Sequence, residues 1–70
     1  MKEYELRVEN SYGNHRIAGF EDLDILMKFT KDNPAKKGFH YYVVITETKQ
    51  ARYNINMITQ ILEAGNRHLL

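Results

Sequence analysis

The chain has 70 residues, of which 43% are hydrophobic and 27% are charged, a composition typical of a folded globular protein and unlike that of a disordered one. It contains no cysteine, which excludes disulfides, thiolate nucleophiles, cysteine-ligated zinc and iron–sulfur clusters. The net charge is +1, but residues 1–33 carry five basic and seven acidic side chains (−2), whereas residues 34–70 carry five basic and two acidic ones (+3).

A chain of this length has room for one hydrophobic core, so we expect residues 1–70 to form a single compact domain. No apolar run is long enough to span a membrane, and residues 1–5 lack the apolar segment of a signal peptide. The sequence therefore predicts a cytoplasmic protein with no membrane partner.

The first elements form a hairpin. Residues 3–9 alternate apolar and charged side chains, which predicts a strand with one wet face. Residues 10–14 contain two asparagines and a glycine, which predicts a hairpin loop with Tyr12 at its tip. Residues 15–18 would return as a short strand in which Ile17 points inward.

A helix is predicted next, over residues 21–32. Its first turn carries three acids, which the positive end of the helix dipole stabilises: Glu21, Asp22 and Asp24. An apolar stripe follows at helical spacing: Leu23, Leu26, Met27 and Thr30, widened by Ile25 and Phe29. Pro34 ends the helix, because the residue before a proline is pushed out of the α region. Residues 34–38 then form an exposed basic connection.

The densest run of β-branched and aromatic residues, 39–46, predicts the central strand of the sheet. One face of this strand is the better core face: Phe39, Tyr41, Val43 and Ile45. The other face is too apolar for free solvent: His40, Tyr42, Val44 and Thr46. We expect no other part of the chain to cover this second face.

The last helix can be capped by Asn54 or Asn56 and ended by Gly65 in the left-handed conformation. Its apolar stripe is Met57, Ile58, Ile61 and Leu62. The two leucines of the tail, Leu69 and Leu70, pack either on the core or on a second copy of the chain.

Residues 51–55 alternate apolar and polar side chains, which predicts a fourth strand, although one long helix from Gln50 also fits the spacing. Tyr, Asn and Ile are indifferent helix formers, so the strand is the favoured interpretation. The predicted fold is a small single α+β domain: an antiparallel sheet of three to four strands with two helices packed on one face, in the order β-β-α-β-β-α.

No catalytic, cofactor or metal site is indicated. The histidines His15, His40 and His68 are scattered without the spacing of metal ligands. Ser11, the sole serine, lies in a turn and has no rigidly held base beside it. The glycines fall at element boundaries and form no phosphate-binding loop. The sequence therefore predicts a protein that is not an enzyme.

A basic and aromatic set on or beside the second face of 39–46 is the main candidate for partner contact: Lys36, Lys37, His40, Tyr42, Lys49 and Arg52. If Arg52 pairs across from that face, cations would alternate with aromatics, as in binders of single-stranded nucleic acid. With Val44, the same face also has the apolar, tyrosine-bearing character of protein-contact surfaces. Three acids could add an electrostatic contact to a basic partner: Glu21, Asp22 and Asp24.

We therefore expect a small non-catalytic binding protein that occupies a surface of a larger intracellular protein, with nucleic-acid binding as the alternative interpretation. Association into a homodimer would add buried surface to a core this small. No family motif is matched. A compact chain without cysteines or motifs resembles, in general style only, the small inhibitor and accessory proteins of phages and other mobile elements.

Overall fold

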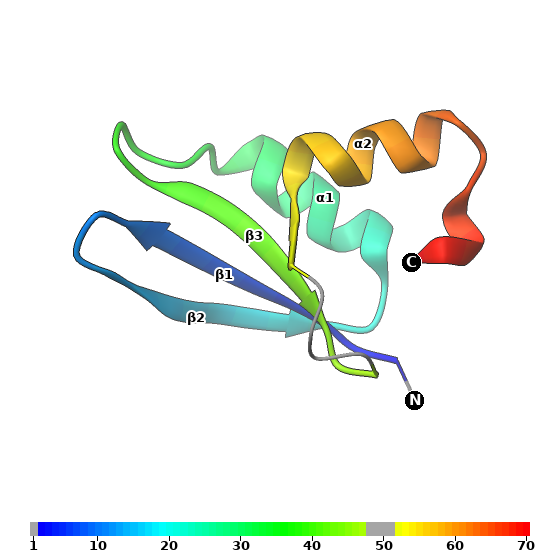
Figure 1. Ribbon diagram of the computed structural model, residues 1–70, viewed down its shortest axis with the longest axis horizontal. Coiled ribbons are helices and arrows are strands. Elements are labelled where there is room, and N and C mark those ends of the chain that lie inside the picture. Colours follow the sequence, from blue (N-terminus) through cyan, green and yellow to red (C-terminus); the bar gives the residue numbers. More distant parts are fainter. Residues whose placement is uncertain (1, 48–51) are drawn as a thin grey trace.

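The computed structural model describes residues 2–47 and 52–70. The elements are β1 (Tyr4–Asn10), β2 (Gly13–Phe20), α1 (Leu23–Asp32), β3 (His40–Ile45), β4 (Arg52–Asn54), α2 (Ile55–Glu63) and a short 3₁₀ helix (Arg67–Leu69). The strands form one antiparallel sheet in the order β2-β1-β3-β4, and both α-helices lie on the same face of it (Figure 1). The predicted α+β fold and its order of elements are confirmed. Neither α1 nor α2, the α-helices of the described residues, is long and apolar enough to cross a membrane.

The hydrophobic core lies between the sheet and the two helices. Four fully buried side chains form its centre, one each from β1, α1, β3 and α2: Leu6, Leu26, Val43 and Ile58. The predicted core face of β3 is confirmed at Val43 and Ile45, which are buried, and at Tyr41, which packs against the core. Phe39 comes before the first residue of β3 and is only half-buried.

The first hairpin is tighter and longer than the sequence predicts. The Asn10 side-chain oxygen accepts hydrogen bonds from the backbone N–H groups of Tyr12 (2.9 Å) and Gly13 (3.1 Å). This Asx-type turn needs only Ser11 and Tyr12 as loop residues, so the strands extend almost to the tip. Tyr12 is 96% exposed there, as predicted.

A β-bulge in the hairpin explains the weak pattern of β2. Leu6 is opposite Ala18 and Arg7 is opposite Arg16, so Ile17 is the additional residue in β2. Ile17 packs against the core, as predicted, but the bulge interrupts the alternation of the strand around it. A prediction from the alternation of apolar and polar side chains therefore gives too short a strand for β2.

Side chains of the residues before each α-helix fix where it begins. The Asp22 carboxylate accepts a hydrogen bond from the Asp24 N–H at 2.8 Å, and the Asn54 amide oxygen accepts one from the Met57 N–H at 2.8 Å. Asn54 thus ends β4 and caps α2, which confirms the strand interpretation for residues 52–54. The first residue of that predicted strand lies outside the described residues.

The end of α2 and the tail fold back on the molecule. Gly65 has a φ of 76° and ends α2 as predicted. The following 3₁₀ helix brings Leu70 into the core, where it is only 2% exposed, whereas Leu69 is 58% exposed. The Tyr4 hydroxyl donates a hydrogen bond to the Leu70 carbonyl oxygen at 3.1 Å. One of the two tail leucines therefore belongs to the core.

Two residues of the predicted helix stripes lie outside the core. Ile25 is 58% exposed, because it lies between Leu23 and Leu26 and so faces away from the side of α1 that they bury. Met57 is 42% exposed, although Ile58 beside it is buried. The first turn of α2 therefore presents a large apolar side chain at the surface.

Candidate functional site

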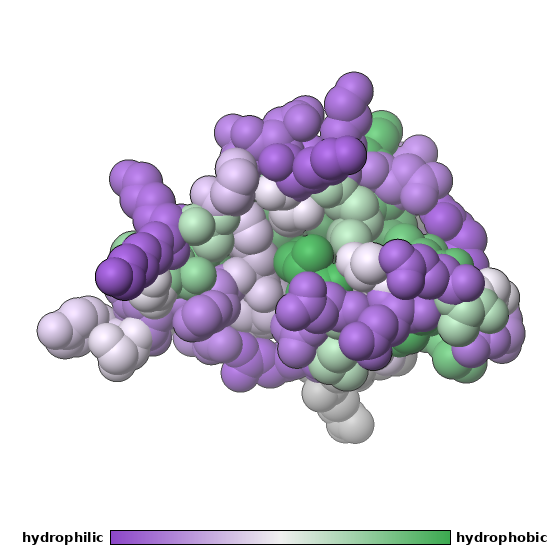
Figure 2. All heavy atoms as spheres, turned by 90° about the horizontal axis from the view of Figure 1, so that it is seen from above, coloured by the Kyte–Doolittle hydropathy of each residue, from purple (hydrophilic) through white to green (hydrophobic). Residues whose placement is uncertain are grey.

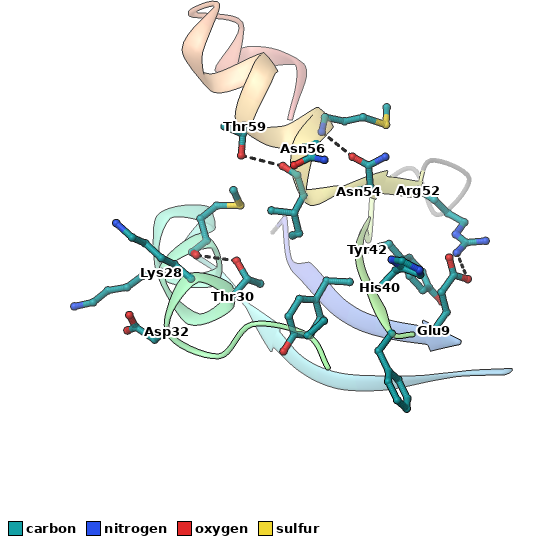
Figure 3. Close-up of a pocket in the computed structure, with 17 residues that line it drawn as sticks. Glu9, Lys28, Thr30, Asp32, His40, Tyr42, Arg52, Asn54, Asn56 and Thr59 are labelled. Atoms are coloured by element: carbon teal, nitrogen blue, oxygen red, sulfur yellow. Dashed lines mark hydrogen bonds and ion pairs between the residues drawn. The ribbon is translucent and has the colours of Figure 1, made fainter. Parts of the chain in front are cut away.

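A groove of about 1210 Å³ lies between the second half of α1, the start of β3 and the junction of β4 with α2. In Figure 3, Lys28, Thr30 and Asp32 lie on one side of it and Asn56 and Thr59 on the other. Figure 2 looks down on the helical side of the molecule, where hydrophobic atoms lie between hydrophilic side chains.

The groove exists because β4 is short. In the described residues, β4 pairs only with Tyr42–Val44, and the chain leaves the sheet at Ile55 to begin α2. The first residues of β3, His40 and Tyr41, therefore run on past the end of β4, and both line the groove. The Asn54 cap fixes this exit, so it also fixes the position of the groove.

Apolar side chains form much of the groove lining. Met27, Tyr41 and Ile55 are half-buried and also pack against the core, while Met57 is 42% exposed. The Tyr41 hydroxyl donates a hydrogen bond to the Asn33 carbonyl oxygen at 2.6 Å, which fixes the tyrosine ring. The two methionines are flexible and polarisable, so this surface can adapt to side chains of different shape.

The hydroxyl groups of the groove are already paired within the protein. The Thr30 hydroxyl donates to the Met27 carbonyl oxygen at 2.8 Å, and the Thr59 hydroxyl donates to the Ile55 carbonyl oxygen at 3.0 Å (Figure 3). Among the described residues, no buried side-chain nitrogen or oxygen lacks a hydrogen-bond partner. Recognition in this groove therefore depends on its apolar surface, on the charges at its rim and on the exposed polar groups of His40 and Asn56.

The rim charge is positive on the α1 side. The stretch from Lys28 to Lys37 contains four lysines and one aspartate, a net charge of +3. Lys28 and Lys31 line the groove, and the other two lysines lie in the loop between α1 and β3. None of these four lysines forms an ion pair with the residues that the structure describes. Their charges are thus free to attract an anionic group.

The open face of the sheet, which is the face opposite the helices, carries ion pairs. Arg7 lies 3.2 Å and Arg16 lies 3.1 Å from the Glu5 carboxylate, and Arg52 lies 2.6 Å from the Glu9 carboxylate. Both glutamates belong to β1, next to β3 in the sheet. The cations of this face are therefore largely neutralised by acids of the same chain.

Tyr42 is covered by two of these arginines. Its hydroxyl accepts a hydrogen bond from Arg7 Nε at 3.0 Å, and the Arg52 guanidinium carbon lies 4.0 Å from its ring centroid. Tyr42 is only 7% exposed, so the expectation that nothing in the chain covers this face is wrong at Tyr42, whereas His40 of the same face is exposed. The hydrogen bond to Tyr42, with Glu5 as a smaller cause, raises the pKa of the Arg7 guanidinium.

The structure divides the predicted partner-contact residues into groups. Three of them lie on the open face of the sheet and line the part of the groove that reaches around β3 and β4 onto that face: His40, Tyr42 and Arg52. The condition set for Arg52 is met, since it lies opposite Val44, which is half-buried. Two of the set lie in the exposed loop before β3: Lys36 and Lys37. Lys49 lies outside the described residues.

The acidic residues Glu21, Asp22 and Asp24 lie at the start of α1, whereas the groove is lined by its second half. Asp22 caps α1, and Asp24 forms a two-bond ion pair with Arg67, at 3.1 and 3.0 Å. This pair raises the pKa of the Arg67 guanidinium. At least two of the three acids therefore stabilise the fold, and none of them reaches the groove.

Sequence reasoning missed Met57 and Met27 as groove residues and Arg7 and Glu9 as neighbours of Tyr42 and Arg52. Met57 lies one turn after Asn54, the cap residue of α2. If the strand had been predicted to end at Asn54, Met57 would have been expected in the first turn of the helix, beside that strand end. Arg7 and Glu9 share the wet face of β1, and a strand order that places β1 beside β3 would have revealed them.

Comparisons with known proteins add no further residue assignments. A scan against protein-family models found no match, and searches of curated proteins and of solved structures also found none. Among the described residues, no group of three or more His, Asp or Glu side chains is placed to hold a metal ion.

Proposed function

We propose that this protein is a non-catalytic binding protein that acts by occupying a surface of a larger intracellular protein, and that the groove between α1 and α2 makes the contact. The observation that carries the proposal is the apolar lining of the groove, which includes the 42% exposed Met57 at the start of α2. Exposed apolar surface rimmed by polar residues is typical of protein-interaction sites. Such a protein would act as an inhibitor or accessory protein, the role of many short chains of phages and mobile elements.

The size and shape of the groove favour a polymer over a small molecule. Its volume of about 1210 Å³ exceeds the roughly 300–1,000 Å³ of typical small-molecule pockets. Its lining comes from two helices and the end of the sheet, so it runs across several elements of the fold. A segment of another protein can fill such a groove with several side chains at once.

Nucleic-acid binding is the second candidate, and it is favoured by the four lysines from Lys28 to Lys37, which form no ion pair within the described residues. On the open face of the sheet, however, His40 is exposed but the larger ring of Tyr42 is covered, so little aromatic surface is free for base stacking. Tyr42 is only 7% exposed beneath Arg52, and Arg52 itself is paired with Glu9 at 2.6 Å. Stacking of bases requires exposed aromatic faces, so the protein partner is better supported.

The proposal predicts that Met57 is needed for partner binding. Met57→Gln keeps a good helix former of similar length but removes apolar surface, and Ile25→Gln makes a comparable change at a 58% exposed position of α1 outside the groove. Tagged wild-type and variant proteins are used to capture partners from nuclease-treated lysate of the source cells. We expect a stoichiometric protein with the wild type and with Ile25→Gln, and a loss of about tenfold or more with Met57→Gln.

Three results would contradict this proposal: capture of no protein, equal capture by both variants, or capture that nuclease treatment abolishes. Circular dichroism of each variant shows whether it is folded. Light scattering after size-exclusion chromatography measures whether two copies associate. A wild-type dimer that Met57→Gln dissociates would mean that the groove holds a second copy of this chain, and would overturn the assignment of a larger partner.

A further inference from the structure

The rim charges of the groove indicate the chemistry of its occupant. We propose that the groove binds a segment of the partner protein in which aspartate or glutamate residues lie next to large apolar side chains. This inference rests on the proposed function, because it specifies the occupant of the same groove.

The apolar half of this specificity comes from Met27, Ile55 and Met57, which line the groove from both helices. Met57 has the most surface to bury, since it is 42% exposed in the free protein. Methionine side chains have several flexible bonds and adapt to the shape of a bound side chain. The groove therefore accepts large aliphatic or aromatic side chains without requiring one particular shape.

The charged half comes from Lys28 and Lys31. Both line the groove and are exposed to solvent, and neither forms an ion pair with the described residues. Figure 3 shows Lys28 on the α1 side of the groove. Two carboxylates also line the groove, those of Glu9 and Asp32. Glu9 is already paired with Arg52, so the negative charge that offsets the two lysines is that of Asp32. The lining thus has a positive excess that complements an acidic segment.

The first turn of α2 adds to this preference. It contains no acidic residue, so no carboxylate of its own offsets the positive end of the helix dipole. Asn54, Ile55, Asn56 and Met57 at this end all line the groove. A carboxylate that enters between α1 and α2 therefore meets lysines on one side and a positive helix end on the other.

The first experiment selects ligands for the immobilised full chain from a library of randomised peptides displayed on phage. We expect enrichment of peptides that combine Asp or Glu with large apolar residues. Their affinity, measured by fluorescence anisotropy, should fall about tenfold with Met57→Gln and stay unchanged with Ile25→Gln. Enrichment of basic or uncharged peptides, or of none, would overturn the inference.

The second experiment tests the charges with matched double variants. Lys28→Glu/Lys31→Glu and Lys36→Glu/Lys37→Glu change the net charge equally, but only the first pair lines the groove. At physiological salt the Debye length is about 8 Å, so distant charges are largely screened. We expect the first variant to weaken binding of the selected peptide about tenfold and the second about twofold. Equal effects would show diffuse attraction and refute a site in the groove.

The two proposals can fail separately. If the lysate yields a partner that depends on Met57 while the selected peptides are basic or neutral, the proposed function stands and the acidic specificity is wrong. If a single-stranded oligonucleotide binds more tightly than the peptides and Lys28→Glu/Lys31→Glu abolishes its binding, the occupant is a nucleic acid and both proposals fall. Self-association that Met57→Gln abolishes and Ile25→Gln leaves unchanged would make a second copy the occupant, and the inferred acidic segment would be wrong.

Discussion

Replacement of Leu70 by alanine should destabilise the protein strongly, because its side chain is buried in the core. Leu70 is 2% exposed and belongs to the core cluster, whereas Leu69 is 58% exposed. Buried Leu→Ala changes cost about 2–5 kcal/mol, so we expect a loss of at least about 2 kcal/mol. Because Leu69→Ala changes the same residue type at an exposed site, it should cost less than about 0.5 kcal/mol.

Urea denaturation followed by circular dichroism measures both changes. A domain of this length is expected to be stable by roughly 4–10 kcal/mol, so the Leu70 change removes a large fraction of its stability. With a urea m-value of about 1 kcal/mol/M, the midpoint should fall by about 2 M for Leu70→Ala and by less than about 0.5 M for Leu69→Ala. Equal midpoints for the two variants would show that the tail does not pack on the core and would refute this reasoning.

Three further changes test how the ends of the helices are held. Asp22→Ala should cost about 1 kcal/mol in urea denaturation because it removes the cap of α1, while Asp22→Asn, which can still accept the hydrogen bond, should cost much less. Gly65→Ala should cost about 1 kcal/mol because the φ of 76° is unfavourable for a residue with a Cβ atom, and an unchanged midpoint would argue against the left-handed conformation there. A double-mutant cycle with Asp24→Ala and Arg67→Ala should show a favourable coupling at low salt that disappears in about 1 M salt, and a coupling independent of salt would contradict an exposed ion pair.

The kinds of element and their order follow from local patterns, which is why the sequence predicts them. The alternation in residues 3–9, the asparagine of the turn and Gly65 each act on neighbours within a few residues. The predicted ends of an element are wrong where the alternation of apolar and polar side chains is interrupted. The bulge interrupts it in β2, which spans Gly13–Phe20 instead of the predicted residues 15–18. Local patterns therefore contain most of the information on secondary structure.

The site depends on long-range pairing, which local patterns do not contain. Arg7 and Tyr42 are 35 positions apart, and Arg52 and Glu9 are 43 positions apart. These contacts exist only because β3 lies between β1 and β4 in the sheet. The position of the groove depends on the residue at which β4 ends. A strand of three residues contains too few alternating apolar and polar side chains for the sequence to indicate that residue.

The bulge at Ile17 also bears on the solubility of the protein. A sheet exposes unpaired backbone groups along its outermost strands, and long flat edges invite pairing with another chain and aggregation. One edge here is β2, where the bulge distorts the strand and the neighbouring Arg16 side chain is 52% exposed. The other edge is β4, which has only three residues. Both edges thus make it unfavourable for a strand of another chain to pair with this sheet. Contacts with other molecules are therefore expected through side chains, not through backbone pairing at the edges.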